Sequence, residues 1–196
     1  MAQLESRQAA PTDDENGSAT STRETRVNHF STFDLAAAFA VDQTRLASRY
    51  RDLQAAVHPD RFVNATDAEK RVAMERAVEV NEAFTTLKDP VRRAMHLLAL
   101  VNIDGMEEKN SAMPFDFLAE QIEWHEALAD AKLKEDEERL EEMSRELTGM
   151  LRSLGETFSA AYAGEHFTVA TTLARKMRFV QKLIEEAESA LADLDQ

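Results

Sequence analysis

Apolar residues recur at steps of three and four along most of the chain, which is the spacing of one face of an α-helix. From residue 29 onward we find no alternating apolar and polar run of the kind that forms a strand, and the whole chain has only five glycines and four prolines. The pattern therefore predicts an all-α fold. It divides the chain into a disordered tail at 1–27, a helical region at 28–101, a polar linker at 102–114 and a second helical region at 115–196.

The first helical region begins with a short helix predicted at 32–39. Asp42 is expected to cap a second helix that runs to about residue 57. Pro59 ends that helix, because its ring disfavours helical geometry at the preceding residue and it has no N–H to donate. The apolar face of the second helix consists of Leu46, Tyr50, Leu53 and Val57.

A third helix is predicted to start at Thr66, which forms a capping-box pattern with Glu69. A fourth is expected at 91–101, directly after Pro90, since proline suits the first position of a helix. The apolar face of the third helix consists of Ala73, Ala77, Val80, Phe84 and Leu87. The second and third helices can thus pack as an antiparallel hairpin with shorter flanking helices.

Three longer helices are predicted in the second region, at 115–131, 134–163 and 166–194. Short connections between long amphipathic helices favour an antiparallel three-helix bundle. Gly149 and Gly155 fall inside the middle helix, where each costs about 1 kcal/mol relative to alanine and would allow a kink. The apolar stripes are Phe117, Gln121, Trp124 and Leu128, then Leu140, Met143, Leu147, Leu151, Leu154 and Phe158, then Leu173, Met177, Val180, Ile184, Ala187 and Leu191.

Charge and composition narrow the classes of function. The net charge is −14, and residues 102–196 carry ten basic and twenty-two acidic side chains, whereas residues 28–101 carry ten of each. Nucleic-acid binding needs a basic surface, so we do not expect it. The chain has no apolar run long enough to cross a membrane and no signal-peptide pattern, which favours a cytoplasmic protein.

Candidate catalytic and metal chemistry is sparse. The chain has no cysteine, which excludes disulfides, thiolate metal sites and cysteine nucleophiles. No two histidines stand three or four residues apart, as a helical metal site would need. A nucleophile elbow and a phosphate-binding glycine loop are also missing. We therefore expect no cofactor, no metal and no enzymatic activity.

The tripeptide His58-Pro59-Asp60 lies between the two helices of the predicted hairpin. Such a sequence is often only a turn, and the composition of this chain would produce it by chance in roughly one such chain in a hundred. Its position favours a docking role, because the rigid proline holds two polar side chains in a fixed geometry. Asp60 can accept charge-assisted hydrogen bonds. The preceding helix carries arginines that suit an acidic partner surface, namely Arg45, Arg49 and Arg51.

These features resemble the J-domain, which implies that the chain stimulates ATP hydrolysis by a DnaK-class heat-shock chaperone. Over residues 28–194 the resemblance extends to the HscB family, the J-domain co-chaperones of iron–sulfur cluster assembly. It is carried by the segments HPDRF at 58–62, VNEAF at 80–84, LKDP at 87–90, RAMHLL at 93–98, FLAEQIE at 117–123 and RKMRF at 175–179.

The HscB resemblance implies that the C-terminal bundle binds an IscU-like cluster scaffold and that the J-domain delivers it to an HscA-like chaperone. The chaperone-binding residues would be His58, Pro59, Asp60, Arg45, Arg49, Arg51 and Arg61. The scaffold-binding residues would be Leu118, Ala119, Ile122, Glu123, Glu126 and Phe179. Two positions depart from the family pattern: Ala119 is smaller than usual, and Arg61 stands where lysine is common.

Helical periodicity is compatible with the scaffold-binding surface. Leu118 and Ile122 lie off the apolar stripe of the 115–131 helix, and Phe179 is about 200° around its helix from Met177. Such leftover apolar residues with an acidic rim often form a partner site. The alternative is that Leu118 and Phe179 pack inside the protein.

Three other functions remain open at this point. The chain could serve a general DnaK-class chaperone with other clients. It could also be a helical assembly protein in which His58-Pro59-Asp60 is only a turn. An all-α hydrolase is a third alternative, but it lacks a recognisable catalytic constellation.

Overall fold

The computed structural model describes residues 27–105 and 114–194, and these residues contain helices and no strand. The elements are α1 (His29–Thr32), α2 (Gln43–Ala56), the 3₁₀ turn η1 (Pro59–Phe62), α3 (Asp67–Lys88), α4 (Pro90–Leu100), α5 (Phe115–Leu133), α6 (Glu137–Ala163) and α7 (Phe167–Leu194). The all-α fold is confirmed. The predicted tail at 1–27, except Val27, and residues 106–113 of the predicted linker lie outside the described residues.

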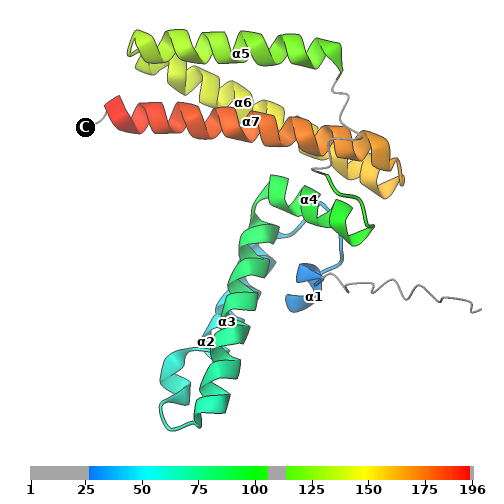
Figure 1. The fold of residues 1–196 in the computed structure, drawn as a ribbon, viewed down its shortest axis with the longest axis vertical. Helices are drawn as coiled ribbons and strands as arrows, with labels where there is room; N and C mark the ends of the chain where they lie inside the picture. The colour runs from blue at the N-terminus through cyan, green and yellow to red at the C-terminus, as the bar shows by residue number, and fades with distance from the viewer. Residues whose placement is uncertain (1–26, 106–113, 195–196) are drawn as a thin grey trace, which may run out of the picture.

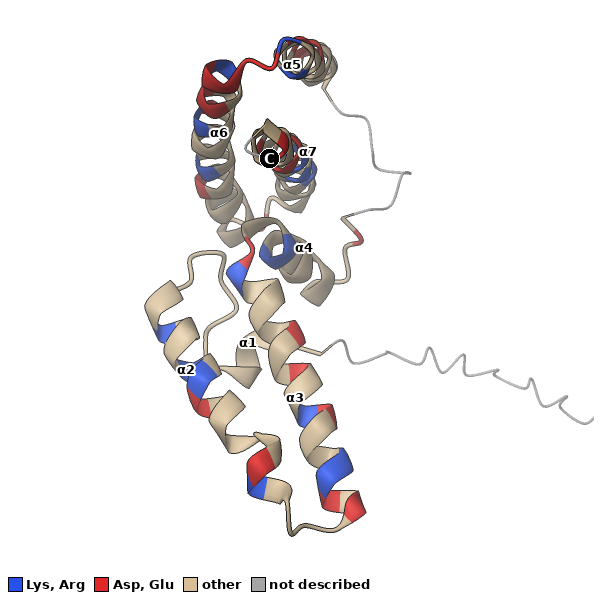
Figure 2. Ribbon diagram, turned by 90° about the vertical axis from the view of Figure 1, so that its left-hand side faces the viewer, with Lys and Arg blue, Asp and Glu red and all other residues tan. Residues whose placement is uncertain are grey.

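The molecule is an antiparallel hairpin joined to a three-helix bundle. Helices α2 and α3 extend away from the bundle, and α4 lies between the hairpin and the bundle (Figure 1). Helices α5, α6 and α7 surround a common centre when they are viewed nearly end-on (Figure 2). The tip of the hairpin and helix α5 are therefore at opposite ends of the molecule.

The helix starts confirm the two predicted caps and add a third at Asp89. The Asp42 carboxylate accepts a hydrogen bond from the Arg45 N–H at 3.0 Å at the start of α2. Thr66 and Glu69 form a reciprocal capping box on α3, and the hydrogen bond from the Thr66 backbone lowers the pKa of Glu69. Asp89 caps α4, which has Pro90 in its first turn. These local signals fix where the hairpin and the connecting helix begin.

The helix predicted at 32–39 is wrong. Helix α1 ends at Thr32, and Asp34 adopts a left-handed φ of 51° while the Leu35 N–H donates to the Phe30 carbonyl. This arrangement closes a helix C-terminus. The alanine-rich segment after it favours a helix by propensity alone, but it runs on as irregular chain and brings Phe39 against α6. Tertiary packing thus overrides local propensity here.

One hydrophobic core spans both halves of the molecule. Phe30, Leu46 and Leu97 from the N-terminal half are fully buried in the same cluster as Phe158 and Met177 from the bundle. In the hairpin, the rings of Tyr50 and Phe84 stack at 4.0 Å, which joins α2 to α3. A second cluster fills the far end of the bundle and is formed by Leu128, Ala131, Leu140, Met143, Leu147, Val180, Leu183, Ile184 and Ala187.

The bundle helices follow the predicted apolar stripes and turn back on each other through tight connections. Glu135 and Glu165 adopt left-handed φ values of 53° and 58° at the ends of α5 and α6. The Asp136 N–H donates to the Ala131 carbonyl, and the His166 N–H donates to the Ala161 carbonyl. These bonds complete the helix ends and make neighbouring helices antiparallel.

Helix α6 runs without interruption through both of its glycines, which differ in surroundings. A Cβ added at Gly149 would meet no heavy atom within 4 Å, whereas one added at Gly155 would lie 2.9 Å from Cε1 of Phe39. Neither glycine ends or interrupts this helix. Gly155 instead makes room for a ring from the other half of the chain.

Substituting the two glycines is expected to change stability in opposite directions. Gly149→Ala should raise the free energy of unfolding by about 1 kcal/mol, because alanine is the better helix former and nothing obstructs it. Gly155→Ala should lower it by about 1–2 kcal/mol, because the new methyl group displaces Phe39. Urea denaturation of both variants measures the difference. Equal changes in the free energy of unfolding would show that the contact between Gly155 and Phe39 does not contribute to stability.

His29 and His96 stack where α1 meets α4. Their ring centroids are 4.5 Å apart, and the His29 backbone N–H donates to Nε2 of His96 at 3.2 Å. Burial, followed by the repulsion of His29, lowers the pKa of His96 to about 4. Burial also lowers the pKa of His29, and Glu82 partly opposes that shift. The contact therefore requires a neutral His96.

The protein is expected to lose stability as the pH falls below the ordinary histidine pKa of 6.5 toward about 4. The unfolded chain then binds a proton that the folded His96 resists, at a cost of roughly 1–2 kcal/mol at pH 5. Chemical denaturation at pH 7 and pH 5 measures this loss. His96→Gln keeps a hydrogen-bond acceptor that does not titrate, so its loss should be smaller. An unchanged pH dependence in that variant would assign the effect to other groups.

Candidate functional site

His58, Pro59 and Asp60 lie at the exposed tip of the hairpin. His58 caps η1 in an extended conformation, and its Nδ1 accepts a hydrogen bond from the Asp60 N–H at 3.3 Å. In the neutral imidazole this hydrogen bond leaves Nε2 as the N–H donor that can face a partner. The Asp60 carboxylate lies 3.5 Å from Nδ1. The tripeptide is therefore a preformed surface in which both polar side chains face solvent.

The four arginines expected to accompany the tripeptide are all exposed, but they do not form one cluster. Arg45 donates to the Asp34 carbonyl at 3.3 Å, and Arg49 lies 3.7 Å from the Asp34 carboxylate. Arg51 is on another side of α2, six residues from Arg45. Arg61 lies in η1, next to the tripeptide. The structure thus brings Arg45 and Arg49 together and separates them from the tip.

An apolar groove of about 610 Å³ lies beside the tripeptide, between the end of α2, η1 and the start of α3. Val72 is largely exposed in this groove. Its lining residues Val57 and Phe62 directly flank the segment that contains the tripeptide. The groove is lined by Val57, Phe62, Ala68, Glu69, Val72, Ala73 and Arg76.

Helix α5 has one face in the bundle and the opposite face in solvent. Phe117 and Leu128 are buried, as the apolar stripe predicted. Leu118 is 43% exposed and Ile122 is 60% exposed, although both are large aliphatic residues. Ala119, Glu123 and Glu126, the other residues predicted on this helix, are exposed as well. The face is thus an apolar strip with a carboxylate border, which is the arrangement of a partner site.

Phe179 is half-buried at the edge of that face. Its ring makes edge contacts with Phe117 at 5.5 Å and with His125 at 5.4 Å, which joins α7 to α5. The ammonium group of Lys176 lies over the ring of Phe117, with Nζ 4.5 Å from the ring centroid. Phe179 therefore packs inside the protein to a larger extent than Leu118 and Ile122. The α5 surface is defined here as Leu118, Ala119, Ile122, Glu123, Glu126 and the exposed part of Phe179.

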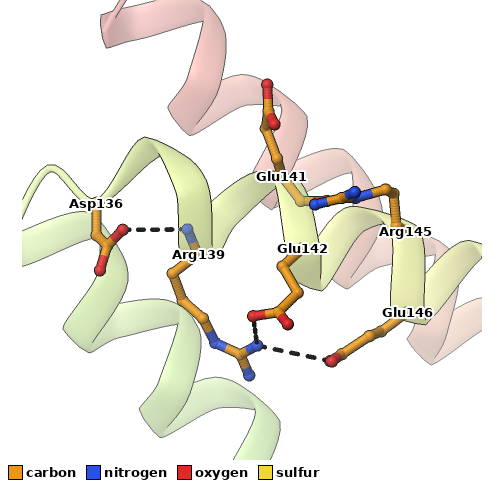
Figure 3. A network of polar contacts seen from close by, with 6 residues as sticks. All are labelled: Asp136, Arg139, Glu141, Glu142, Arg145 and Glu146. Carbon is orange, nitrogen blue, oxygen red and sulfur yellow. Dashed lines mark hydrogen bonds and ion pairs between the residues drawn. The ribbon is translucent and has the colours of Figure 1, made fainter.

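The acid-rich start of α6 forms a solvated network. The Asp136 carboxylate caps the helix by accepting from the Arg139 N–H at 3.1 Å. The Arg139 guanidinium lies 2.6 Å from Glu142 and 3.7 Å from Glu146, and the hydrogen bond to Glu142 raises the Arg139 pKa. Figure 3 shows these contacts along one side of the helix. The network stabilises the helix start and contains no candidate ligand site.

Two further types of site are missing from the parts of the chain that the structure describes. No helix at 27–105 or 114–194 is long and apolar enough to cross a membrane. Over the same ranges, no three histidine or acidic side chains gather closely enough to hold a metal ion.

Comparison with known proteins decides the family. The family model described as "HSCB C-terminal oligomerisation domain" matches residues 113–188. A relative from Ralstonia nicotianae named "Co-chaperone protein HscB homolog" is 41% identical over 168 residues, which cover 85% of this chain and 96% of the relative. The chain belongs to the HscB family of co-chaperones. The resemblance read from the motifs is thereby confirmed.

Solved HscB structures share the fold. The chaperone HscB from Vibrio cholerae superposes with a TM-score of 0.74 at 32% identity, covering 86% of this chain and 99% of that one. The human co-chaperone HscB gives a TM-score of 0.76 at 28% identity over 93% of each chain. The hairpin half is the J-domain of an HscB-family protein, and α5, α6 and α7 form its C-terminal helical domain.

Sequence reasoning missed the residues that join the J-domain to the bundle. Arg93 is buried, although its neighbour Arg92 is exposed. A signal was available, because Arg93 stands four residues before the buried Leu97 and so lies on the same side of α4. Phe39 was assigned to a helix that does not form. Nothing in the pattern paired Phe39 with Gly155.

Proposed function

We propose that this HscB-family chain is a non-enzymatic adaptor in iron–sulfur cluster assembly. It binds an IscU-like scaffold protein through the α5 surface, delivers it to an HscA-like chaperone of the DnaK class and stimulates the ATPase of that chaperone. The observation that carries the proposal is the exposure of two unlike docking surfaces at opposite ends of one molecule. The iron–sulfur cluster is cargo of the scaffold and needs no ligand from this chain.

The hairpin tip would engage the chaperone. Asp60 is free to accept from a cationic side chain of the partner, and Nε2 of His58 is free to donate. Pro59 holds the two side chains in place before contact, so little conformational entropy is lost on docking. Arg45 and Arg49 would attract an acidic surface and increase the rate of encounter.

The α5 surface would engage the scaffold. Leu118 and Ile122 are four residues apart on one face of the helix, so together they form an apolar strip that a partner can cover. Glu123 and Glu126 border the strip and would select a partner with basic residues at matching positions. Ala119 adds little area, since its side chain is a single methyl group.

The direct test is the ATPase rate of an HscA-like chaperone, measured with this protein, with the scaffold and with both together. We expect moderate stimulation by this protein alone and a rate with both that exceeds the sum of the separate effects. Linked binding raises the local concentration of the scaffold at the chaperone, which explains the excess. Purely additive rates would contradict the adaptor proposal.

A second candidate is a co-chaperone of a general DnaK-class chaperone with other clients. The hairpin tip supports it equally well, because nothing at His58 or Asp60 identifies one chaperone of the class. The α5 surface distinguishes the two candidates. A calorimetric titration that detects no binding of the scaffold would favour the second candidate.

A further inference from the structure

A cavity of about 830 Å³ lies between the segment that leads into α2, the start of α4 and the middle of α6. Its walls are mainly apolar and include Phe39, Val41 and Leu151, which are half-buried at the edge of the core. Pockets that bind small molecules have this size and character, with a few polar groups that fix the orientation of the ligand. We refer to this space as the junction cavity.

Arg93 lies in the wall of the junction cavity and is a buried cation. Only 7% of the residue is exposed. Its Nη1 donates to the Leu87 carbonyl at 2.5 Å, and its guanidinium lies over the ring of Phe39 at 4.8 Å. Its Nε has no hydrogen-bond partner. Since a guanidinium has five N–H groups to donate, the described residues use only part of the hydrogen-bonding capacity of Arg93.

The charge of Arg93 has no partner of opposite sign among the described residues. Burial lowers the pKa of Arg93, and the charge of Asp89 opposes that shift. Both Asp89 oxygens are already used, because Oδ1 accepts from the Arg92 N–H at 2.7 Å and Oδ2 accepts from the Gln181 side chain at 2.7 Å. A buried charge without a partner costs free energy. The inner wall of the cavity therefore favours a bound anion.

Charges at the rim of the cavity do not cancel this preference. Arg152 and Glu156 also line the cavity, and both are exposed on α6. They have opposite signs and lie in water, where interactions between charges are weak. Arg93 lies in a mainly apolar wall, where the same interactions are stronger. The buried cation therefore decides which sign of charge the cavity prefers.

We propose that the junction cavity binds a small apolar carboxylate, such as a fatty acid of medium chain length. The carboxylate accepts charge-assisted hydrogen bonds from the Arg93 guanidinium, which suits its planar geometry. The apolar body lies along Phe39, Val41 and Leu151. A water molecule in place of the carboxylate would accept a hydrogen bond but would leave the charge of Arg93 uncompensated. The cavity shares no lining residue with the hairpin tripeptide or the α5 surface, so the inference is independent of the proposed function.

A nuclear magnetic resonance titration of the full chain with decanoate tests the cavity directly. We expect saturable shifts of the amide signals of Gln43, Thr148 and Ser159, which line it, with a dissociation constant of about 0.1 mM. Decanol has the same chain length without the charge, so it should bind at least about tenfold more weakly. The absence of saturable shifts, or equal binding of decanol and decanoate, overturns the proposal.

Arg93→Met removes the charge and keeps an apolar side chain of similar length. The affinity for decanoate should fall about tenfold or more, whereas the affinity for decanol should stay within about twofold. Such a replacement of a buried charge is often tolerated by the fold. Arg92→Met is the matched control, because it makes the same substitution at the neighbouring exposed residue, outside the cavity. Its affinity for decanoate should be unchanged. Full affinity in Arg93→Met overturns the role of the buried cation.

Ser159→Leu tests the volume of the cavity while it keeps Arg93. Ser159 is half-buried in the wall that α6 provides, so a leucine there fills space that the apolar body needs. Binding of decanoate and of decanol should both weaken. If Arg93→Met does not fold, this variant and the two ligands still test the proposal. Unaltered binding by Ser159→Leu places decanoate elsewhere and overturns it. Tighter binding of a short apolar peptide through its C-terminal carboxylate would replace the small molecule with a protein terminus, which also overturns it.

Discussion

Replacing His58 with alanine is expected to abolish stimulation of the chaperone ATPase while leaving the protein folded. The side chain is 58% exposed, and its hydrogen bond with the Asp60 N–H is long. Loss of a central docking residue costs 2 kcal/mol or more, so stimulation at limiting protein should fall by about thirtyfold. Asp60→Ala should have the same effect, because its carboxylate is 86% exposed and supports no other part of the fold.

The control for the hairpin tip is Asn64→Ala, an exposed residue in the loop before α3. This substitution should leave both stimulation and stability unchanged. All three variants should unfold within about 0.5 kcal/mol of the original protein, as exposed positions usually do. Full stimulation by His58→Ala and Asp60→Ala would show that the tripeptide is only a turn and would refute its assignment as the chaperone site.

The double substitution Leu118→Ala with Ile122→Ala is expected to weaken scaffold binding by about thirtyfold or more. The two side chains form the centre of the α5 surface, where truncation removes the apolar area that a partner would bury. They are exposed in the free protein, so stability should change little. Isothermal titration with the scaffold measures the loss. ATPase stimulation without the scaffold should be unaffected, because the hairpin tip is at the other end of the molecule.

Leu133→Ala provides the matched control for this experiment. Leu133 is an aliphatic residue at the end of the same helix, 85% exposed and outside the α5 surface. Equal weakening by the control and the double variant would argue against a specific surface. Phe179→Ala needs an unfolding measurement beside the titration, since the ring also packs on Phe117 and His125.

Local signals allowed much of the fold to be predicted. The caps at Asp42, Thr66 and Asp89 are each formed by residues no more than three positions apart. Such a cap can therefore be recognised without knowing the rest of the fold. The apolar stripes of the bundle are also local patterns that repeat over many turns. The exposure of Leu118 and Ile122 followed from the same periodicity, because the buried stripe left them on the opposite face.

Contacts between distant segments could not be predicted in this way. The composition of residues 32–39 favours a helix, but the segment is irregular because Phe39 packs on the ring of Phe158 in α6. The depth of Phe179 depends on two aromatic neighbours from another helix. The burial of Arg93 depends on the place where Phe39 comes to lie. In each case the deciding partner is far away in the chain, and helical periodicity contains no information about it.

The packing of Phe39 on Phe158 also affects how the chain folds while it is being synthesised. The two residues are separated by about 120 positions, which takes roughly ten seconds to translate. During that time the J-domain half has left the ribosome without α6, and Phe39 has no ring to pack against. The hairpin can form early from its own neighbours, but its orientation is set only at the end of synthesis. A partner that binds the hairpin tip before that moment meets a hairpin that is not yet packed against α6.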